Sequence, residues 1–357
     1  MRTSLLSLLL LAVLGGVPGV EGQSLTVGYN QGWIEGGWGH DLSDRFDAAA
    51  WTRILRRTRE GGGSVVRVWL LEDRTYEGVV WDGHRPEGVE PAFLANLRTL
   101  CALAEAEGVQ LYWALIDGNW HGGKGLEFDR QFNVCNDKYG HGARFRQRVL
   151  GPILDVLQER PRVNYGLDLI NEVQGAVREH VWPDGWTGAR RFLATTAAFV
   201  HARAPGLKVT ASSGHHSAAW DLLLGRFDGL GLDLYDVHVY SDAGKIPFAS
   251  FLARHARCKQ LPIVVGEFGQ KRKQVDPALQ ARVTAGVLAQ AQRLGFSAVF
   301  AWRLEDEQAH DRRFSFYDGA RPRPALNVMR AAAGLPPLDL NASTPGLAGA
   351  VGGASPP

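Results

Sequence analysis

The sequence predicts a single-domain α/β fold, a (β/α)8 TIM barrel in which eight parallel strands form a closed ring inside a layer of helices. Short β-rich runs alternate with amphipathic helical stretches eight times after residue 22. Segments that follow the runs are long and aromatic, whereas segments that precede them are short and marked by glycine. Eight such units in about 310 residues fit a closed barrel better than an open doubly wound sheet. The first run also lacks the G-x-G-x-x-G pattern that such a sheet uses for dinucleotides.

The eight expected strands are continuous apolar runs, which is typical of parallel strands covered by helices. In chain order they are Leu25–Asn30, Val65–Leu70, Val109–Ile116, Val163–Ile170, Leu207–Ala211, Leu234–Val239, Pro262–Val265 and Ala298–Trp302. Two of the helices between them have clear ends. Pro91 opens one that stops at Gly108. Asp276 caps another, which has Pro277 in its first turn and ends at Gly295.

Both ends of the chain are expected to lie outside the barrel. Arg2 precedes the apolar run Leu5–Val17, and this pattern predicts an export signal over residues 1–22, too short to span a bilayer. The catalytic barrel is expected over 23–334, and the segment 335–357, rich in Gly, Pro and Ala, is expected to be a flexible tail. The mature protein is therefore expected to be secreted, either extracellular or periplasmic, and monomeric.

Composition excludes several classes of partner and cofactor. The 39 Lys and Arg residues nearly balance 37 Asp and Glu, and no long basic run suggests nucleic-acid binding. Cys101 and Cys258 are expected to pack within helices and Cys135 to lie in a loop, so at most one disulfide can form. No metal or other cofactor is expected. His215-His216 lack partners at a ligand spacing, which favours a substrate-binding or simply exposed role.

Polar residues gather where the expected strands end. Almost every polar group that interrupts an apolar run does so at its carboxyl end, and those ends share one face of a barrel. A half-buried carboxylate without a partner would cost kilocalories there, so a functional reason for the pattern is favoured. The groups are Arg67, Trp69, Asp117, Asn119, Trp120, Asn171, Glu172, Asp236, His238, Tyr240, Glu267 and Trp302.

Two of these residues, Glu172 and Glu267, are the candidate catalytic pair. Glycoside hydrolysis uses two carboxyl groups, and in retaining enzymes they lie about 5 Å apart. The fourth and seventh strands face each other across an eight-stranded barrel, so the two side chains can meet at that distance. Arg67 is expected to keep Glu267 ionised, and the charge of Glu267 to help hold Glu172 protonated. Taken singly, each glutamate is explained about equally well by a structural role, helix capping for Glu172 and ion pairing for Glu267, as by catalysis. Together with Arg67, His238 and Trp302, the catalytic interpretation is favoured.

The chain resembles clan A glycoside hydrolases, most closely family 5. The resemblance rests on Asn171-Glu172 after the fourth strand and on Glu267 within Val-Gly-Glu-Phe-Gly at the seventh, and it spans about residues 25–333. It implies that Glu172 is the acid/base and Glu267 the nucleophile. It further implies substrate-binding or positioning roles for the surrounding residues: Asn171 on the sugar 2-hydroxyl, Arg67 and Tyr240 on the nucleophile, His238 beside the pair, and Trp302 as subsite floor.

One departure from the family pattern concerns the third strand, which many family 5 enzymes end with a histidine. This chain offers Asp117, Asn119 and Trp120 instead, an arrangement reminiscent of the mannan-cleaving branch. The expected activity is retaining hydrolysis of a β-linked, β-1,4 type mannan or glucan. A non-catalytic carbohydrate-binding barrel and an exo-acting β-glycosidase of another clan A family are the alternatives.

The sequence also has tryptophans outside the strand ends. Trp33, Trp38, Trp182 and Trp186 follow strands, and one or two of the tryptophans in such segments are expected to be sugar platforms on the rim. Trp51 and Trp220 fall in helical patterns and are expected in the core.

Overall fold

A computed structural model describes residues 25–34, 42–71, 76–119, 125–305 and 313–340. The expected export signal over 1–22, residues 341–357 of the expected tail, and Trp38 and Trp120 lie outside the described residues. In the part of the chain that is described, no helix combines the length and apolar character needed to cross a membrane.

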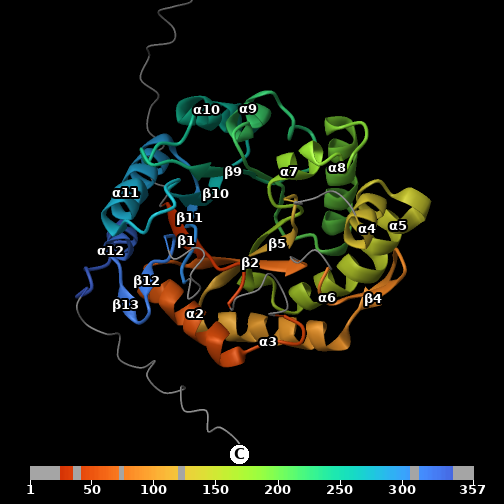
Figure 1. Cartoon of the computed structure of the whole chain (residues 1–357), viewed down its shortest axis with the longest axis horizontal. Coiled ribbons are helices and arrows are strands. Elements are labelled where there is room, and N and C mark those ends of the chain that lie inside the picture. Colours follow the sequence, from red (N-terminus) through yellow and green to blue (C-terminus); the bar gives the residue numbers. More distant parts are fainter. Residues whose placement is uncertain (1–24, 35–41, 72–75, 120–124, 306–312, 341–357) are drawn as a thin grey trace, which may run out of the picture.

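The barrel predicted from the sequence is confirmed (Figure 1). All pairings within it are parallel, and its strands follow the order β7-β6-β5-β2-β1-β11-β10-β9-β8. They are β1 (Thr26–Asn30), β2 (Val65–Leu71), β5 (Gln110–Ile116), β6 (Asn164–Asp168), β7 (Val209–Thr210), β8 (Ser212–Ser213), β9 (Tyr235–Tyr240), β10 (Ile263–Gly269) and β11 (Ala298–Ala301).

The fifth position of the barrel is divided into two short strands. Its first part, β7, pairs with β6 through Val209, and its second part, β8, pairs with β9 through Ser212. Only Ala211 separates the two parts, so together they close the ring between the fourth and sixth positions. The expected run Leu207–Ala211 therefore continues two residues further than its apolar pattern indicated.

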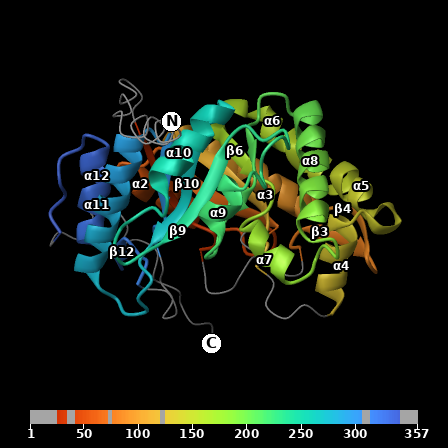
Figure 2. The same ribbon diagram turned by 90° about the horizontal axis from the view of Figure 1, so that it is seen from above.

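Helices surround the strands on the outside (Figures 1 and 2). They are α2 (Ala48–Glu60), α3 (Pro91–Glu107), α4 (Leu126–Cys135), α5 (His141–Phe145), α6 (Gly151–Glu159), α7 (Val173–Arg178), α8 (Trp186–Arg203), α9 (Ala218–Leu223), α10 (Ala249–Lys259), α11 (Pro277–Leu294) and α12 (Pro324–Ala332). Both helices with predicted ends are confirmed. Gly108 ends α3 at φ 64°, and Asp276 caps α11 by accepting a 2.8 Å hydrogen bond from the Leu279 amide.

Two antiparallel hairpins were not expected from the sequence. One pairs β3 (Val79–Asp82) with β4 (Arg85–Val89), and the other pairs β12 (Tyr317–Asp318) with β13 (Arg321–Pro322). Both lie within long segments that follow barrel strands, where short strands of two to five residues leave little periodicity. In Figure 2, β4 lies beside α4 and α5 at one side of the barrel.

Several expected core positions need correction. Trp51 is 1% exposed, as predicted, but Trp220 is 51% exposed and the core prediction for it is wrong. The six-residue helix α9 lies on the outside of the barrel and turns Trp220 onto Phe248, with ring centroids 4.6 Å apart. Cys258 is exposed rather than packed, Cys135 ends α4 rather than lying in a loop, and all three cysteines are free.

Candidate active site

The two candidate glutamates lie at the carboxyl ends of opposite strands. Glu267 is part of β10, whereas Glu172 follows β6 and directly precedes α7. Glu172 adopts a left-handed backbone conformation, φ 50° and ψ 62°, which is rare for a residue with a side chain. Its amide donates a 2.9 Å hydrogen bond to Oγ of Ser212, which helps hold that conformation. Such strain is often found where a side chain must be aimed at a functional position.

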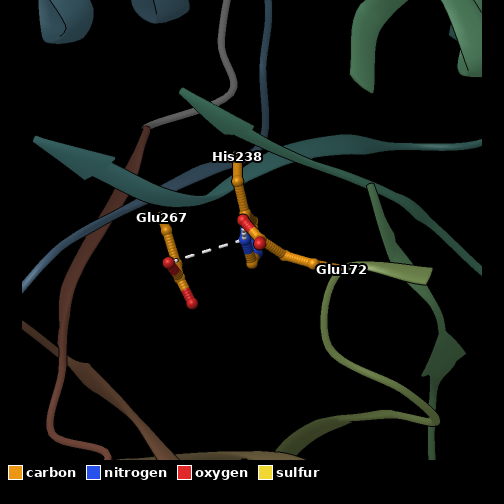
Figure 3. A group of neighbouring side chains, drawn as sticks. All are labelled: Glu172, His238 and Glu267. Carbon is orange, nitrogen blue, oxygen red and sulfur yellow. Dashed lines mark hydrogen bonds and ion pairs between the residues drawn. The ribbon is translucent and has the colours of Figure 1, made fainter. Parts of the chain in front are cut away.

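The side chains of Glu172, His238 and Glu267 point toward one another (Figure 3). Each contributes an atom to a group whose members lie within 4.8 Å of one another, so one carboxylate oxygen of each glutamate lies within that distance of the other. Exposed fractions are 9% for Glu172 and 4% for Glu267. A separation of about 5 Å is what double displacement requires, because the nucleophile and the acid must reach the same glycosidic bond.

Cationic and hydroxyl donors occupy both oxygens of Glu267. Nη1 of Arg67 lies 2.8 Å from Oε1, and the hydroxyl of Tyr240 donates to Oε2 at 2.7 Å. The other nitrogen, Nη2 of Arg67, donates to Asp168 at 2.7 Å and to Asn171 at 2.9 Å. Arg67 is 0% exposed and does not line the cleft, so it positions Glu267 and Asn171 from below.

Glu172 receives donors on both oxygens as well. Nδ1 of His238 lies 3.1 Å from Oε1. On the other oxygen, Oε2, the amide of Asn119 donates at 2.8 Å, and Nε2 of His215 lies 3.3 Å away. His238 is also 3.5 Å from Oε2 of Glu267, so this imidazole lies between the two carboxylates.

The resting pKa values run opposite to the order expected from the sequence. Burial opposes ionisation of Glu172, but the hydrogen bond and charge of His238, the charge of His215 and the bond from Asn119 outweigh it and lower the pKa to about 2. Burial raises the pKa of Glu267, against the opposing charges of His238 and Arg67. Burial alone would lower the pKa of His238, yet the neighbouring acids raise it to about 9. In the empty cleft the proton therefore resides on His238 rather than on Glu172.

A cleft of about 420 Å³ opens above the pair. Among its lining residues are Trp69, Asn119, Asn171, Tyr240 and Trp302, all of them predicted site residues. Three tryptophans pack edge-to-face under it: Trp69 and Trp302 at a centroid distance of 6.4 Å, and Trp33 at 5.7 Å from Trp302. Aromatic surface beside two acids suits a sugar ring, which has apolar C–H faces and polar edges.

The expected rim platforms are not found where the sequence placed them. Trp33 is 7% exposed and supports Trp302 from behind. Trp182 is 0% exposed, and its indole N–H donates to the Cys135 carbonyl at 3.2 Å. Trp186 is half-buried and packs on Phe227 with ring centroids 5.6 Å apart. Although these tryptophans follow strands in the sequence, none of the three forms a rim platform. Trp38 and Trp120, the other candidates, lie outside the described residues, so the expectation of one or two rim platforms stays a prediction.

The same three groups, Glu172, His238 and Glu267, have the donor atoms for a cation, but their present bonding does not favour one. Both oxygens of Glu267 already accept from Arg67 and Tyr240. The raised pKa of His238, about 9, keeps its ring protonated, and an imidazolium has no lone pair to offer a metal. The arrangement is that of an ion-paired acid cluster.

Two residues that hold this cluster together were not among the predicted site residues, although Asp236 stands among the polar groups at the strand ends. Asp168 pairs with Arg67 in the barrel interior, and Asp236 accepts from the hydroxyl of Tyr112 and the amide of Gly266. Both are 0% exposed. A carboxylate inside an otherwise apolar strand was the signal available for each. His215 was considered, but its contact with Glu172 joins residues 43 positions apart (215 − 172), which no local pattern reveals.

Comparison with known proteins extends the fold result. No family model matches the sequence, and no curated protein does. Among solved structures, a β-mannanase from the blue mussel Mytilus edulis is 19% identical, with a TM-score of 0.63. The alignment covers 81% of this chain and 90% of the mussel enzyme. A β-1,4-D-mannanase from Cryptopygus antarcticus is 17% identical, with a TM-score of 0.65 and coverages of 90% and 93%.

A further similar structure is GH5_18 from Streptomyces cattleya, solved in complex with GlcNAc. It is 17% identical, with a TM-score of 0.62, and covers 87% of this chain and 80% of its own. At these identities the similarity establishes the fold, which these structures share with this chain over most of its length.

Proposed function

We propose that this chain is a retaining glycoside hydrolase that cleaves β-linked polysaccharide or oligosaccharide of the β-1,4-mannan type. The observation that carries the proposal is the pair Glu172 and Glu267, whose oxygens lie within 4.8 Å of each other at the base of an aromatic cleft. Two of the structures with the same fold are named as β-mannanases, which favours mannan over glucan as the first substrate to test.

In the first step an oxygen of Glu267 attacks the anomeric carbon. The bond from that carbon to the glycosidic oxygen breaks, and the departing oxygen takes a proton from Glu172. Arg67 and Tyr240, each within 2.8 Å of a Glu267 oxygen, orient the attacking carboxylate. They also stabilise the same carboxylate when it leaves again in the second step.

In the second step a water molecule attacks the anomeric carbon, and the bond from that carbon to the Glu267 oxygen breaks. Glu172, now ionised, takes the proton of that water and is thereby returned to its acid form. A first proton for Glu172 is at hand, because protonated His238 lies 3.1 Å from Oε1. A sugar ring over the pair would exclude water from Glu172 and so favour its neutral form.

Export belongs to the same proposal. Residues 1–22 have the charged start and apolar core of a secretion signal. A polysaccharide is too large to enter a cell intact, so secretion suits an enzyme of this substrate class.

The proposal is tested by a product profile. The secreted chain is incubated with a panel of soluble β-mannans and β-glucans, and new reducing ends and oligosaccharide lengths are followed over time. We expect turnover on β-mannan, and loss of that turnover in Glu267→Ala with the folded structure retained. Saturable binding of glycans with no release of reducing ends would instead identify a carbohydrate-binding barrel.

A further inference from the structure

The proposed acid/base Glu172 is contacted by a series of hydrogen-bonded side chains that the hydrolytic mechanism does not itself require. Oε2 of Glu172 accepts a 2.8 Å hydrogen bond from Nδ2 of Asn119, and Oδ1 of Asn119 lies 2.6 Å from Nε2 of His215. Nη2 of Arg178 lies 2.8 Å from Nδ1 and 3.1 Å from Nε2 of His215, a position over the face of the imidazole ring. Arg178 is the last residue of α7, the short helix that begins directly after Glu172.

The identity of each group decides which atom donates and which accepts along this series of contacts. An ionised carboxylate only accepts, so the Asn119 amide must present Nδ2 to Glu172 and Oδ1 to His215. An amide oxygen only accepts as well, so Nε2 of His215 must carry a hydrogen. The guanidinium of Arg178 lies close to both ring nitrogens, and its positive charge disfavours a second charge on the imidazole, so Nδ1 of His215 is expected to lack a proton. The result is a neutral imidazole with its hydrogen on Nε2.

The backbone supports a dedicated placement of His215. Its φ of 61° lies in the left-handed region, as does that of Glu172 at 50°. Two non-glycine residues in this conformation face each other across 3.3 Å. Strained backbone at both ends of one contact is expected where geometry is selected for a site.

We infer that Arg178, His215 and Asn119 form a positioning arm for the acid/base Glu172, in which Arg178 holds His215 as the neutral Nε2–H imidazole. The arm supplies the hydrogen bond from Asn119 to Oε2 without placing a second positive charge beside it. It thereby leaves Oε1, which faces His238, as the oxygen that receives the catalytic proton. This inference rests on the proposed function, because it assigns the arm to the proton chemistry of the same site.

Other charged groups around the arm also influence the pKa values of Glu172 and His215. Glu172 also faces His238 from β9, Glu267 from β10 and Asp117 from the end of β5. His215 faces Glu172, Arg178, His238 and the adjacent His216. Burial, and then the charges of Arg178, His238 and His216, lower the pKa of His215 against the opposing effect of Glu172. Removal of Arg178 therefore favours protonation of His215.

The first experiment measures the protonation state of the His215 imidazole directly and does not depend on hydrolysis. Nitrogen NMR of the full chain at pH 6, with the His215 signal assigned through His215→Gln, reports the protonation and tautomer of this ring. We expect a neutral ring with its hydrogen on Nε2 in the wild type, and a larger protonated fraction of the ring in Arg178→Gln. The matched control is Arg191→Gln on α8, which removes another exposed arginine, one paired with Asp184 at 3.2 Å. A His215 ring with the same protonation in wild type and Arg178→Gln would overturn the inference.

The second experiment reads the effect on the acid/base through the pH profile of kcat/KM. Its alkaline limb reports loss of the proton from the acid. His215→Ala removes the donor that holds the Asn119 amide in place for its bond to Glu172, so the limb should move to higher pH by about 0.5–1 unit. His215→Gln, which keeps an N–H, should restore part of the shift. An unchanged limb in His215→Ala would overturn the inference. If the wild type hydrolyses no glycan, the proposed function fails, and the NMR result still decides on the arm.

Discussion

Nη1 of Arg67 lies 2.8 Å from Oε1 of Glu267, and the whole Arg67 side chain is sealed from solvent. The same guanidinium pairs with Asp168 at 2.7 Å. One buried cation from β2 thus compensates two buried acids, one on β6 and one on β10, and links three strands of the barrel to the candidate nucleophile.

Loss of that cation should destabilise the fold as well as the site. In Arg67→Met, Asp168 and Glu267 are left as buried charges without their partner, and removing one member of a buried ion pair costs about 3–5 kcal/mol. Urea unfolding measures the loss. Arg98→Met is the control, because Arg98 and Glu159 form an exposed pair at 2.8 Å, for which about 0–1 kcal/mol is expected. Equal losses in the two variants would contradict this account of Arg67.

A second prediction concerns the space that Gly214 leaves for the acid/base. A Cβ atom at this position would lie 2.2 Å from Cδ of Glu172, so Gly214→Ala must displace that carboxylate. A displacement of about 1 Å at a catalytic group lowers turnover by about 100-fold. The control is Gly206→Ala, where a Cβ would meet no atom within 4 Å. The kcat of both variants on β-mannan provides the measurement, and Gly214→Ala with unchanged kcat would show that Glu172 need not stay in place.

A third prediction concerns stability at alkaline pH. Burial opposes protonation of His238, but Glu267, Glu172 and Asp236 raise its pKa from 6.5 to about 9. A raised pKa stabilises the folded state fully below 6.5, and this contribution is lost as the pH rises through 9. The change corresponds to about 3 kcal/mol.

The comparison that isolates this effect is between the wild type and His238→Gln. Their difference in unfolding free energy, measured by urea titration at pH 6 and at pH 9.5, should be larger at pH 6. A difference that stays constant or grows with pH would mean that His238 is neutral in the folded protein.

The sequence could predict the barrel and the meeting of its two candidate glutamates because both leave local signals. Parallel strands covered by helices are continuous apolar runs, and a polar residue such as Glu172 or Glu267 stands out where such a run ends. Once the runs are ordered around a ring, the two acids face each other without any knowledge of side-chain positions.

Other features depend on contacts that no run of residues encodes. The direction in which Trp33, Trp182 and Trp220 turn is decided by the aromatic side chains packed against them, not by their distance from a strand. The order of the two pKa values was predicted from Arg67 and from the charge of Glu267. The structure adds His238, Asn119 and His215 around Glu172, and these neighbours reverse the order. Both outcomes arise from neighbours far apart in the chain.

The central claim is that Glu267 attacks the anomeric carbon directly, since its carboxylate lies too close to that of Glu172 to admit a water between substrate and base. Proton NMR of the anomeric signals during the first minutes of β-mannan hydrolysis tests this claim before mutarotation mixes the anomers. The account predicts that the first reducing ends released have the β configuration. Initial release of the α anomer would contradict it and would make the two glutamates an inverting acid and base.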